Sequence, residues 1–169
     1  MTLRLILTRH AKSSWGDALL DDHDRPLNDR GRRSATTIGR WLAMQDYLPD
    51  LVLSSDAART RETWALMSEA MSTRPDVVWS RDLYLAPAGT MMRVLQAANA
   101  TTVMMLGHNP GIAGFAAMLA KYPAAHPRFR DYPTGATTVM TFGGGTFSQV
   151  DWGTGTIVDF VTPRDFRID

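Results

Sequence analysis

Residues 2–15 read TLRLILTRHAKSSW, and this stretch decides the fold of the chain. Leu3, Leu5, Ile6 and Leu7 form a short apolar run rich in branched side chains, which is typical of a buried strand in a parallel sheet. Arg9, His10 and Lys12 follow directly. In open α/β sheets, ligands bind beyond the carboxyl ends of the strands. The stretch therefore predicts Arg9 and His10 at the edge of a ligand crevice, although taken alone it also fits a surface turn of solvated cations.

Composition narrows the class of protein. A length of 169 residues fits a single domain over residues 1–169, and 44% hydrophobic with 21% charged residues is ordinary for a soluble globular protein. The net charge of +1 gives no global field that favours nucleic acid or a membrane surface. The absence of cysteine excludes disulfides, thiolate catalysis and cysteine-bound metal. Without a signal-peptide pattern or a long apolar run, we expect a cytoplasmic protein.

Apolar runs alternate with helical patterns along most of the chain. After the strand at residues 3–7, we expect helices at 29–45, 57–71, 90–98 and 110–122, and strands at 51–53, 76–79, 102–106, 136–142 and 156–160. This order predicts an α/β fold with three layers, namely a mostly parallel central sheet with helices on both faces. The last two strands have little helical pattern between them, so they predict an antiparallel edge near the C-terminus.

Local signals place the helix ends and their inner faces. The expected N-terminal caps are Asn28 or Asp29 for the first helix, residues 54–56 for the second, and Asn109 before Pro110 for the fourth. Spacing predicts that two sets of side chains face the core, which are Ala35, Ile38, Trp41, Leu42 and Gln45 in the first helix and Trp64, Met67 and Met71 in the second.

Cationic and imidazole side chains follow three of the predicted strands. The first strand runs into Arg9 and His10, the second into Ser55 with Arg59 one helical turn later, and the fourth into His108. Arg25, from the loop after the first strand, is placed to join them. Arginine forks and helix N-termini both favour anions, and a dianionic phosphoryl group neutralises such a cluster best. Carboxylate or sulfate recognition would use the same groups.

Histidine beside a bound phosphoryl group can act as a nucleophile, because neutral imidazole has a lone pair at neutral pH. Four sequence blocks carry a resemblance at this point, and they are LTRHAKSSW (7–15), DRPLNDRGRRSA (24–35), SSDAARTRET (54–63) and MMLGHNPGI (104–112). In this order they resemble the histidine phosphatase (phosphoglycerate mutase-like) superfamily, and most of all its short SixA-type phosphohistidine phosphatases. The resemblance implies that His10 is the nucleophile, and that the phosphoryl group is held by Arg9, Arg25, Arg59 and His108.

Two departures from the family pattern bear on the substrate. Ala11 stands where many members have glycine, and only Asp82 is offered for the acid that protonates an alcohol leaving group. An imidazole leaving group needs no strong acid, so we expect hydrolysis of phosphohistidine in a protein, for example a histidine phosphotransfer domain. The alternatives are a phosphomonoesterase acting on a small phosphorylated metabolite and a non-catalytic module that binds phosphate. No metal and no cofactor are expected, and neither nucleic acid nor a membrane is an expected partner.

Other polar residues receive no catalytic role. His23 and His126 lie in polar loops, and the histidine spacing predicts no zinc site. Asp21, Asp22 and Asp24 lack the glycine and distal glutamate of a calcium loop, so they predict a solvated acidic segment that can orient Arg25. Lys12 can screen the substrate or remain solvated.

Overall fold

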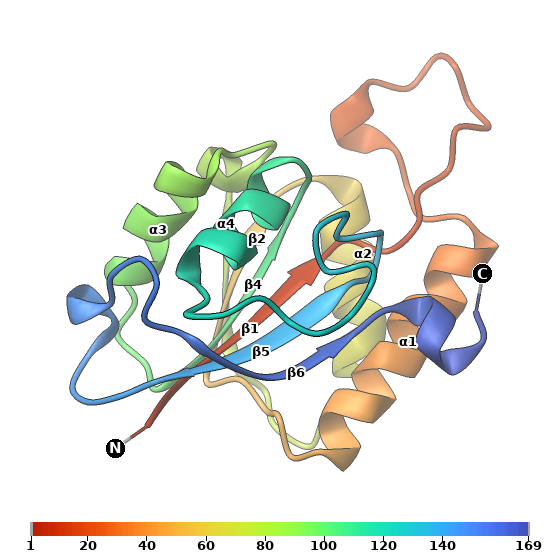
Figure 1. Cartoon of the computed structure of the whole chain (residues 1–169). Helices are drawn as coiled ribbons and strands as arrows, with labels where there is room; N and C mark the ends of the chain where they lie inside the picture. The colour runs from red at the N-terminus through yellow and green to blue at the C-terminus, as the bar shows by residue number, and fades with distance from the viewer. Residues whose placement is uncertain (1, 169) are drawn as a thin grey trace.

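The computed structural model describes residues 2–168 and contains one six-stranded sheet (Figure 1). The strand order is β3-β2-β4-β1-β5-β6. The first four strands in this order are parallel, whereas β5 runs antiparallel to β1 and β6 antiparallel to β5. The strand bounds are β1 Leu3–Arg9, β2 Leu51–Ser55, β3 Asp76–Ser80, β4 Thr102–Gly107, β5 Thr137–Phe142 and β6 Thr156–Val161. The mostly parallel sheet and its antiparallel edge near the C-terminus are thereby confirmed.

Helices cover both faces of this sheet (Figure 1). The four α-helices are α1 Asp29–Met44, α2 Ala58–Ser68, α3 Ala88–Gln96 and α4 Gly111–Leu119, and the short 3-10 turns are η1 Asp22–Asp24, η2 Arg81–Leu83, η3 Phe147–Gln149 and η4 Pro163–Phe166. One core lies under α1 and α2 and a second under α3 and α4. Strand β1 serves both, because Leu5 and Leu7 face the α3–α4 core while Ile6 faces the α1–α2 core. Within residues 2–168, the helices are too short or too polar to cross a membrane.

The register of the parallel strands decides which side chains meet. Arg9 at the end of β1 pairs with Gly107 at the end of β4, so the residues that follow each strand lie side by side. The backbone N–H of His10 donates to the Gly107 carbonyl at 3.2 Å. On the other side of β4, Ser54 of β2 pairs with Leu106. The ends of β1, β4 and β2 therefore form one edge, as the strand-end pattern predicted.

Glycine at position 31 lets α1 pack against the segment that follows β1. A Cβ atom on Gly31 would lie 2.0 Å from the Lys12 carbonyl oxygen, which no side chain can tolerate. The Lys12 carbonyl also accepts from the backbone N–H of Asn28 at 3.0 Å. The first turn of α1 thus holds the backbone beside His10 in place.

The predicted caps are partly wrong. Asn28 does cap α1, since its side chain accepts from the Gly31 N–H at 2.8 Å. Ser54 and Ser55 instead belong to β2, because both pair with β3 and Ser54 also pairs with β4. Helix α2 begins at Ala58 without a side-chain cap. Asn109 does not cap α4, because its amide donates to the carbonyls of residues 131 and 132.

Helix lengths and inner faces also differ in part from expectation. Helix α2 ends at Ser68 and α4 at Leu119, earlier than the pattern indicated. Trp64, Met67 and Met71 are buried as predicted. Gln45 is exposed because α1 has already ended at Met44, and Trp41 is only half-buried at the rim of the core.

Candidate active site

His10 follows β1 and is held in one orientation by the backbone. Its side chain is 5% exposed, and Nδ1 lies 2.7 Å from the carbonyl oxygen of Ala11. Because a carbonyl can only accept, Nδ1 carries the proton and Nε2 keeps its lone pair. The Ala11 N–H donates to Thr63 Oγ1 at 3.0 Å, which fixes the peptide that orients the ring. Burial lowers the pKa of His10 well below its ordinary value, so the ring is neutral at neutral pH.

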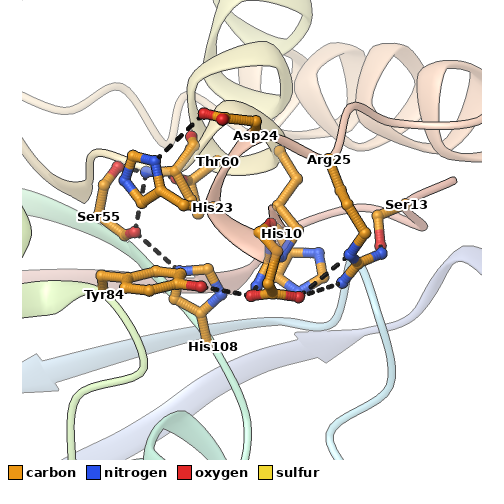
Figure 2. A network of polar contacts seen from close by, with 12 residues as sticks. His10, Ser13, His23, Asp24, Arg25, Ser55, Thr60, Tyr84 and His108 are labelled. Atoms are coloured by element: carbon orange, nitrogen blue, oxygen red, sulfur yellow. Dashed lines mark hydrogen bonds and ion pairs between the residues drawn. The ribbon is translucent and has the colours of Figure 1, made fainter. Parts of the chain in front are cut away.

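His108 follows β4, and its ring centroid lies 5.2 Å from that of His10 (Figure 2). Its Nε2 is 2.7 Å from Ser55 Oγ, and the same oxygen accepts from the Ala57 N–H at 3.2 Å. The single hydroxyl proton of Ser55 is best placed when it is donated to His108 Nε2, which leaves the imidazole proton on Nδ1. Within residues 2–168, His108 Nδ1 is buried without a hydrogen-bond partner. Burial, followed by the charge of Arg59, lowers the pKa of His108 to about 3.

The three predicted arginines converge on the same cleft. Arg59 is 2% exposed, and its Nη1 donates to the Asp22 carbonyl at 2.7 Å. Arg25 donates from Nη1 to Ser13 Oγ at 2.6 Å, and the two lie beside His10 in Figure 2. Arg9 donates from Nη1 to the Tyr132 carbonyl at 3.1 Å, and its pKa is lowered by burial and then by the charge of Arg59. The cleft has a volume of about 440 Å³ and is lined by Arg9, His10, Lys12, Ser13, Trp15, Asp22, Arg25, Arg59, Leu85, His108, Asn109 and Thr134.

Asp22 holds two of these arginines together. Its Oδ2 accepts from Arg59 Nη2 at 3.0 Å, and its Oδ1 lies 3.0 Å from Arg25 Nη2. Tyr84 donates its hydroxyl proton to the same carboxylate. The hydrogen bonds from Tyr84, Arg59 and Arg25 lower the pKa of Asp22 far below its ordinary value, so it is a carboxylate and not an acid at neutral pH.

The acidic loop holds more of the site than its sequence indicates. The spacing of its carboxylates predicts that they can orient Arg25, but it singles out neither Asp22 nor Tyr84. Asp22 stands three residues before Arg25 in η1, and the two form an i, i+3 ion pair. That spacing next to the Arg-Pro-Leu block was the available signal. Tyr84 left no signal, because it reaches Asp22 from 62 residues away.

The remaining candidates lie at the rim or outside the cleft. Trp15 is exposed and stacks on the Arg25 guanidinium, with 3.6 Å between the guanidinium carbon and the ring centroid. Lys12 is exposed at the rim. His23 bonds to Asp56 at 2.7 Å, and both are outside the set of residues that line the cleft.

Two further side chains lie apart from the site. Asp82 is exposed on the 3-10 turn η2 and lines a separate hollow beside α3, so it does not reach the cleft. His126 bonds to the Asp165 carboxylate at 3.0 Å, near the C-terminal turn η4. In the part of the chain that the structure describes, no group of three or more histidine, aspartate or glutamate side chains is arranged to hold a metal ion.

Comparison with known proteins agrees with this geometry. Residues 5–82 match the sequence model of the histidine phosphatase superfamily, branch 1. An uncharacterized protein of Mycobacterium tuberculosis is 32% identical over 163 residues, which cover 92% of this chain and 99% of the relative. The chain belongs to the histidine phosphatase superfamily. An uncharacterized chloroplastic protein of Arabidopsis thaliana is 36% identical, but the match spans 69% of this chain and only 59% of the plant protein.

Solved structures place this histidine phosphatase beside proteins described as SixA. The putative phosphohistidine phosphatase SixA from Nakamurella multipartitia has a TM-score of 0.81 and 27% identity, with 96% of this chain and 97% of that chain covered. The corresponding protein from Agrobacterium tumefaciens has a TM-score of 0.77 and 30% identity, covering 95% and 98%. Family and fold together support phosphatase chemistry that proceeds through phosphohistidine.

Proposed function

We propose that this histidine phosphatase transfers a phosphoryl group to Nε2 of His10 and then to water, and that its substrate is phosphohistidine in a protein. One observation carries the proposal. The bond from His10 Nδ1 to the Ala11 carbonyl leaves the Nε2 lone pair available in a cleft whose lining includes Arg9, Arg25 and Arg59. A neutral, oriented imidazole in a cationic cleft is suited to attack phosphorus.

Binding in this scheme uses the gathered cations. Arg9, Arg25 and Arg59 take the phosphoryl oxygens, and their planar forks match the spread of charge in the transition state. His108 donates from Nδ1, the buried nitrogen that has no hydrogen-bond partner among residues 2–168. The carboxylate of Asp22 keeps Arg25 and Arg59 side by side, which offsets their mutual repulsion before substrate binds. Positive charge from arginine supplies the stabilisation that a metal ion supplies in other phosphatases, so we propose a cycle without metal or cofactor.

The leaving group follows from the proton donors that the cleft holds. Asp22 is ionised at neutral pH because its pKa is lowered, and Asp82 lies elsewhere, so neither protonates an alkoxide. A phosphohistidine ring that is protonated on its other nitrogen leaves as neutral imidazole and needs no additional acid. In the first step the His10 Nε2–phosphorus bond forms and the substrate nitrogen–phosphorus bond breaks. In the second step water attacks the phosphorus and the bond from His10 Nε2 to phosphorus breaks, which regenerates the neutral imidazole and releases phosphate with the proton lost by the water.

The substrate class also has support from relatives. Two structures with at least 27% identity are described as putative phosphohistidine phosphatases, and they are matched over nearly their whole length. The connection from β1 to α1, residues 10–28, lines the cleft and contains the 3-10 turn η1 but no α-helix that would cover the site. An exposed phosphoryl group on a protein surface is the substrate that such a site accommodates best.

One experiment tests the nucleophile and the substrate together. The unmodified protein and His10→Gln are compared on a phosphohistidine peptide and on a panel of sugar and nucleotide phosphates, with and without EDTA. We expect the peptide to be preferred in kcat/KM, EDTA to have no effect, and a brief pulse to leave acid-labile, base-stable label on the protein. His10→Gln should lose the label and at least about 10⁴-fold in kcat.

Other outcomes identify the alternatives. A large preference for a member of the panel would indicate a small-molecule phosphomonoesterase and overturn the proposed substrate. Binding of the peptide without phosphate release and without label would indicate a binding module and overturn the proposed activity.

A further inference from the structure

Cationic side chains continue from the active-site cleft into a neighbouring hollow. The cleft shares Lys12 and Thr134 with a second hollow of about 210 Å³, which is lined by Arg30, Arg128 and Arg164 as well. The two hollows are therefore contiguous through Lys12. No carboxylate is among the described residues that line the second hollow.

A third hollow extends the same surface along α1. It has a volume of about 420 Å³, shares Ile168 with the second hollow, and is lined by Arg33 and Arg40 together with Arg32 and two threonines. Its described lining also contains no carboxylate. The whole chain has a net charge of only +1, so this concentration of positive charge is local. We call the surface from Lys12 through Arg30 and Arg33 to Arg40 the basic band.

The basic band has no evident role in holding the fold together. Arg30, Arg33 and Arg40 are exposed, and within residues 2–168 none lies within 4 Å of a carboxylate oxygen. Arg32 differs, since it pairs with Asp29 and lies 3.6 Å from a Glu62 oxygen. Arg30 also stands in the first turn of α1, where the helix dipole disfavours positive charge. Exposed cations without a carboxylate partner among the described residues, one of them at an unfavourable helix position, are typical of a surface that binds an anionic partner.

We propose that the basic band binds an acidic segment of the phosphoprotein substrate that lies next to its phosphohistidine, an inference that rests on the proposed function. A rise of about 1.5 Å per residue places Arg30 and Arg40 about 15 Å apart along α1. An extended segment of about five residues spans that length. One polypeptide can therefore place its phosphoryl group in the cleft and its carboxylates along the band. A nucleic acid would match the charge of the band, but it offers no phosphohistidine to the cleft at its end.

The test uses two phosphohistidine peptides of one design, in which about six residues on each side are all glutamate or all glutamine. Turnover by the unmodified protein is compared with turnover by Arg30→Glu/Arg40→Glu. The matched control is Arg93→Glu/Lys121→Glu, which makes the same change in net charge at exposed sites away from the basic band. At low ionic strength we expect the unmodified protein and the control to prefer the glutamate peptide by about tenfold in kcat/KM. The band variant should lose this preference while its kcat/KM for the glutamine peptide stays unchanged.

Three results would overturn the basic band as a docking surface. The first is equal turnover of both peptides by the unmodified protein. The second is an equal loss of the preference for the glutamate peptide in the band variant and in the control. The third is displacement of the glutamate peptide by a DNA duplex at lower concentration than by unlabelled peptide. Failure of the proposed function is separable, because fluorescence anisotropy of the unphosphorylated glutamate peptide reports binding without turnover. Tight binding that only the band variant loses would support the band even if neither phosphopeptide were hydrolysed.

Discussion

The ends of β1 and β4 each present a buried histidine, and the two imidazoles differ in what holds them. His10 bonds through Nδ1 to a backbone carbonyl, whereas His108 bonds through Nε2 to the hydroxyl of Ser55. Both rings are neutral at neutral pH, because burial lowers the pKa of each. Since both rings are buried and uncharged, the hydrogen-bond partner is what distinguishes them.

That difference assigns opposite chemistry to the same side chain. A carbonyl only accepts, so it places the proton of His10 on Nδ1 and leaves Nε2 as an electron-pair donor. A hydroxyl can donate or accept, so the second hydrogen bond that the same oxygen makes decides which of the two it does toward the imidazole. In this site the Ala57 N–H donates to Ser55, so the hydroxyl proton is directed at His108 and the imidazole proton remains on Nδ1. We therefore expect a nucleophile at the end of β1 and a hydrogen-bond donor at the end of β4.

Among the changes that separate the roles of the two histidines, replacement of His108 should have the largest effect on turnover. His108→Ala should lower kcat by about 10²–10³, because it removes one donor to the transition-state oxygens, while His10 should still become labelled. Steady-state turnover and pulse labelling measure the two quantities. His126→Ala, a histidine that bonds to Asp165 away from the cleft, is the matched control and should leave both unchanged. Loss of labelling in His108→Ala would contradict the division of roles.

The free energy of unfolding should decrease at acid pH, because both imidazole rings are buried in the neutral form. Both folded pKa values lie below the unfolded value of about 6.5, so between these values the unfolded chain binds more protons and stability falls as pH decreases. At pH 5.5 the loss for His108 should be on the order of 1 kcal/mol relative to neutral pH, and His10 should add a loss of the same sign.

Urea unfolding at several pH values measures this loss. His108→Gln should show a shallower fall than the unmodified protein, because one of the two buried rings is gone. Stability that is constant or rising from pH 7.5 to 5.5 would show that the rings are not held neutral by the fold.

Sequence periodicity predicted the strand ends well because it reports burial directly. The apolar runs of β1 and β4 end beside Arg9, His10 and His108, and parallel pairing then leaves little freedom in where these side chains meet. The family resemblance added the order of the four blocks and the place of Arg59 and Arg25. The sequence could therefore predict that five side chains lie in one cleft, namely Arg9, His10, Arg25, Arg59 and His108.

The supporting contacts could not be predicted, since they depend on pairs that are distant in sequence. The sequence predicts Ser55 as part of a helix cap, because Ser-Ser-Asp before a helical pattern is a cap signal. Pairing with Ser80 of β3 instead keeps it in the strand, where its hydroxyl contacts His108. Asp22 was interpreted as part of a solvated loop, because nothing local reveals that Arg59 and Tyr84 reach it from elsewhere.

Removal of the Ser55 hydroxyl is the smallest change that separates the two histidines. Ser55→Ala should lower kcat by about tenfold, the cost of one hydrogen bond, because His108 then loses the group that keeps its proton on Nδ1. A loss of packing alone would also reduce activity, so the decisive readout is the tautomer. Nitrogen-15 chemical shifts of the imidazoles should show His108 protonated at Nδ1 in the unmodified protein and in exchange between tautomers in Ser55→Ala. His10 should stay protonated at Nδ1 in both proteins, since the Ala11 carbonyl is untouched, and an unchanged His108 tautomer would show that Ser55 does not position that proton.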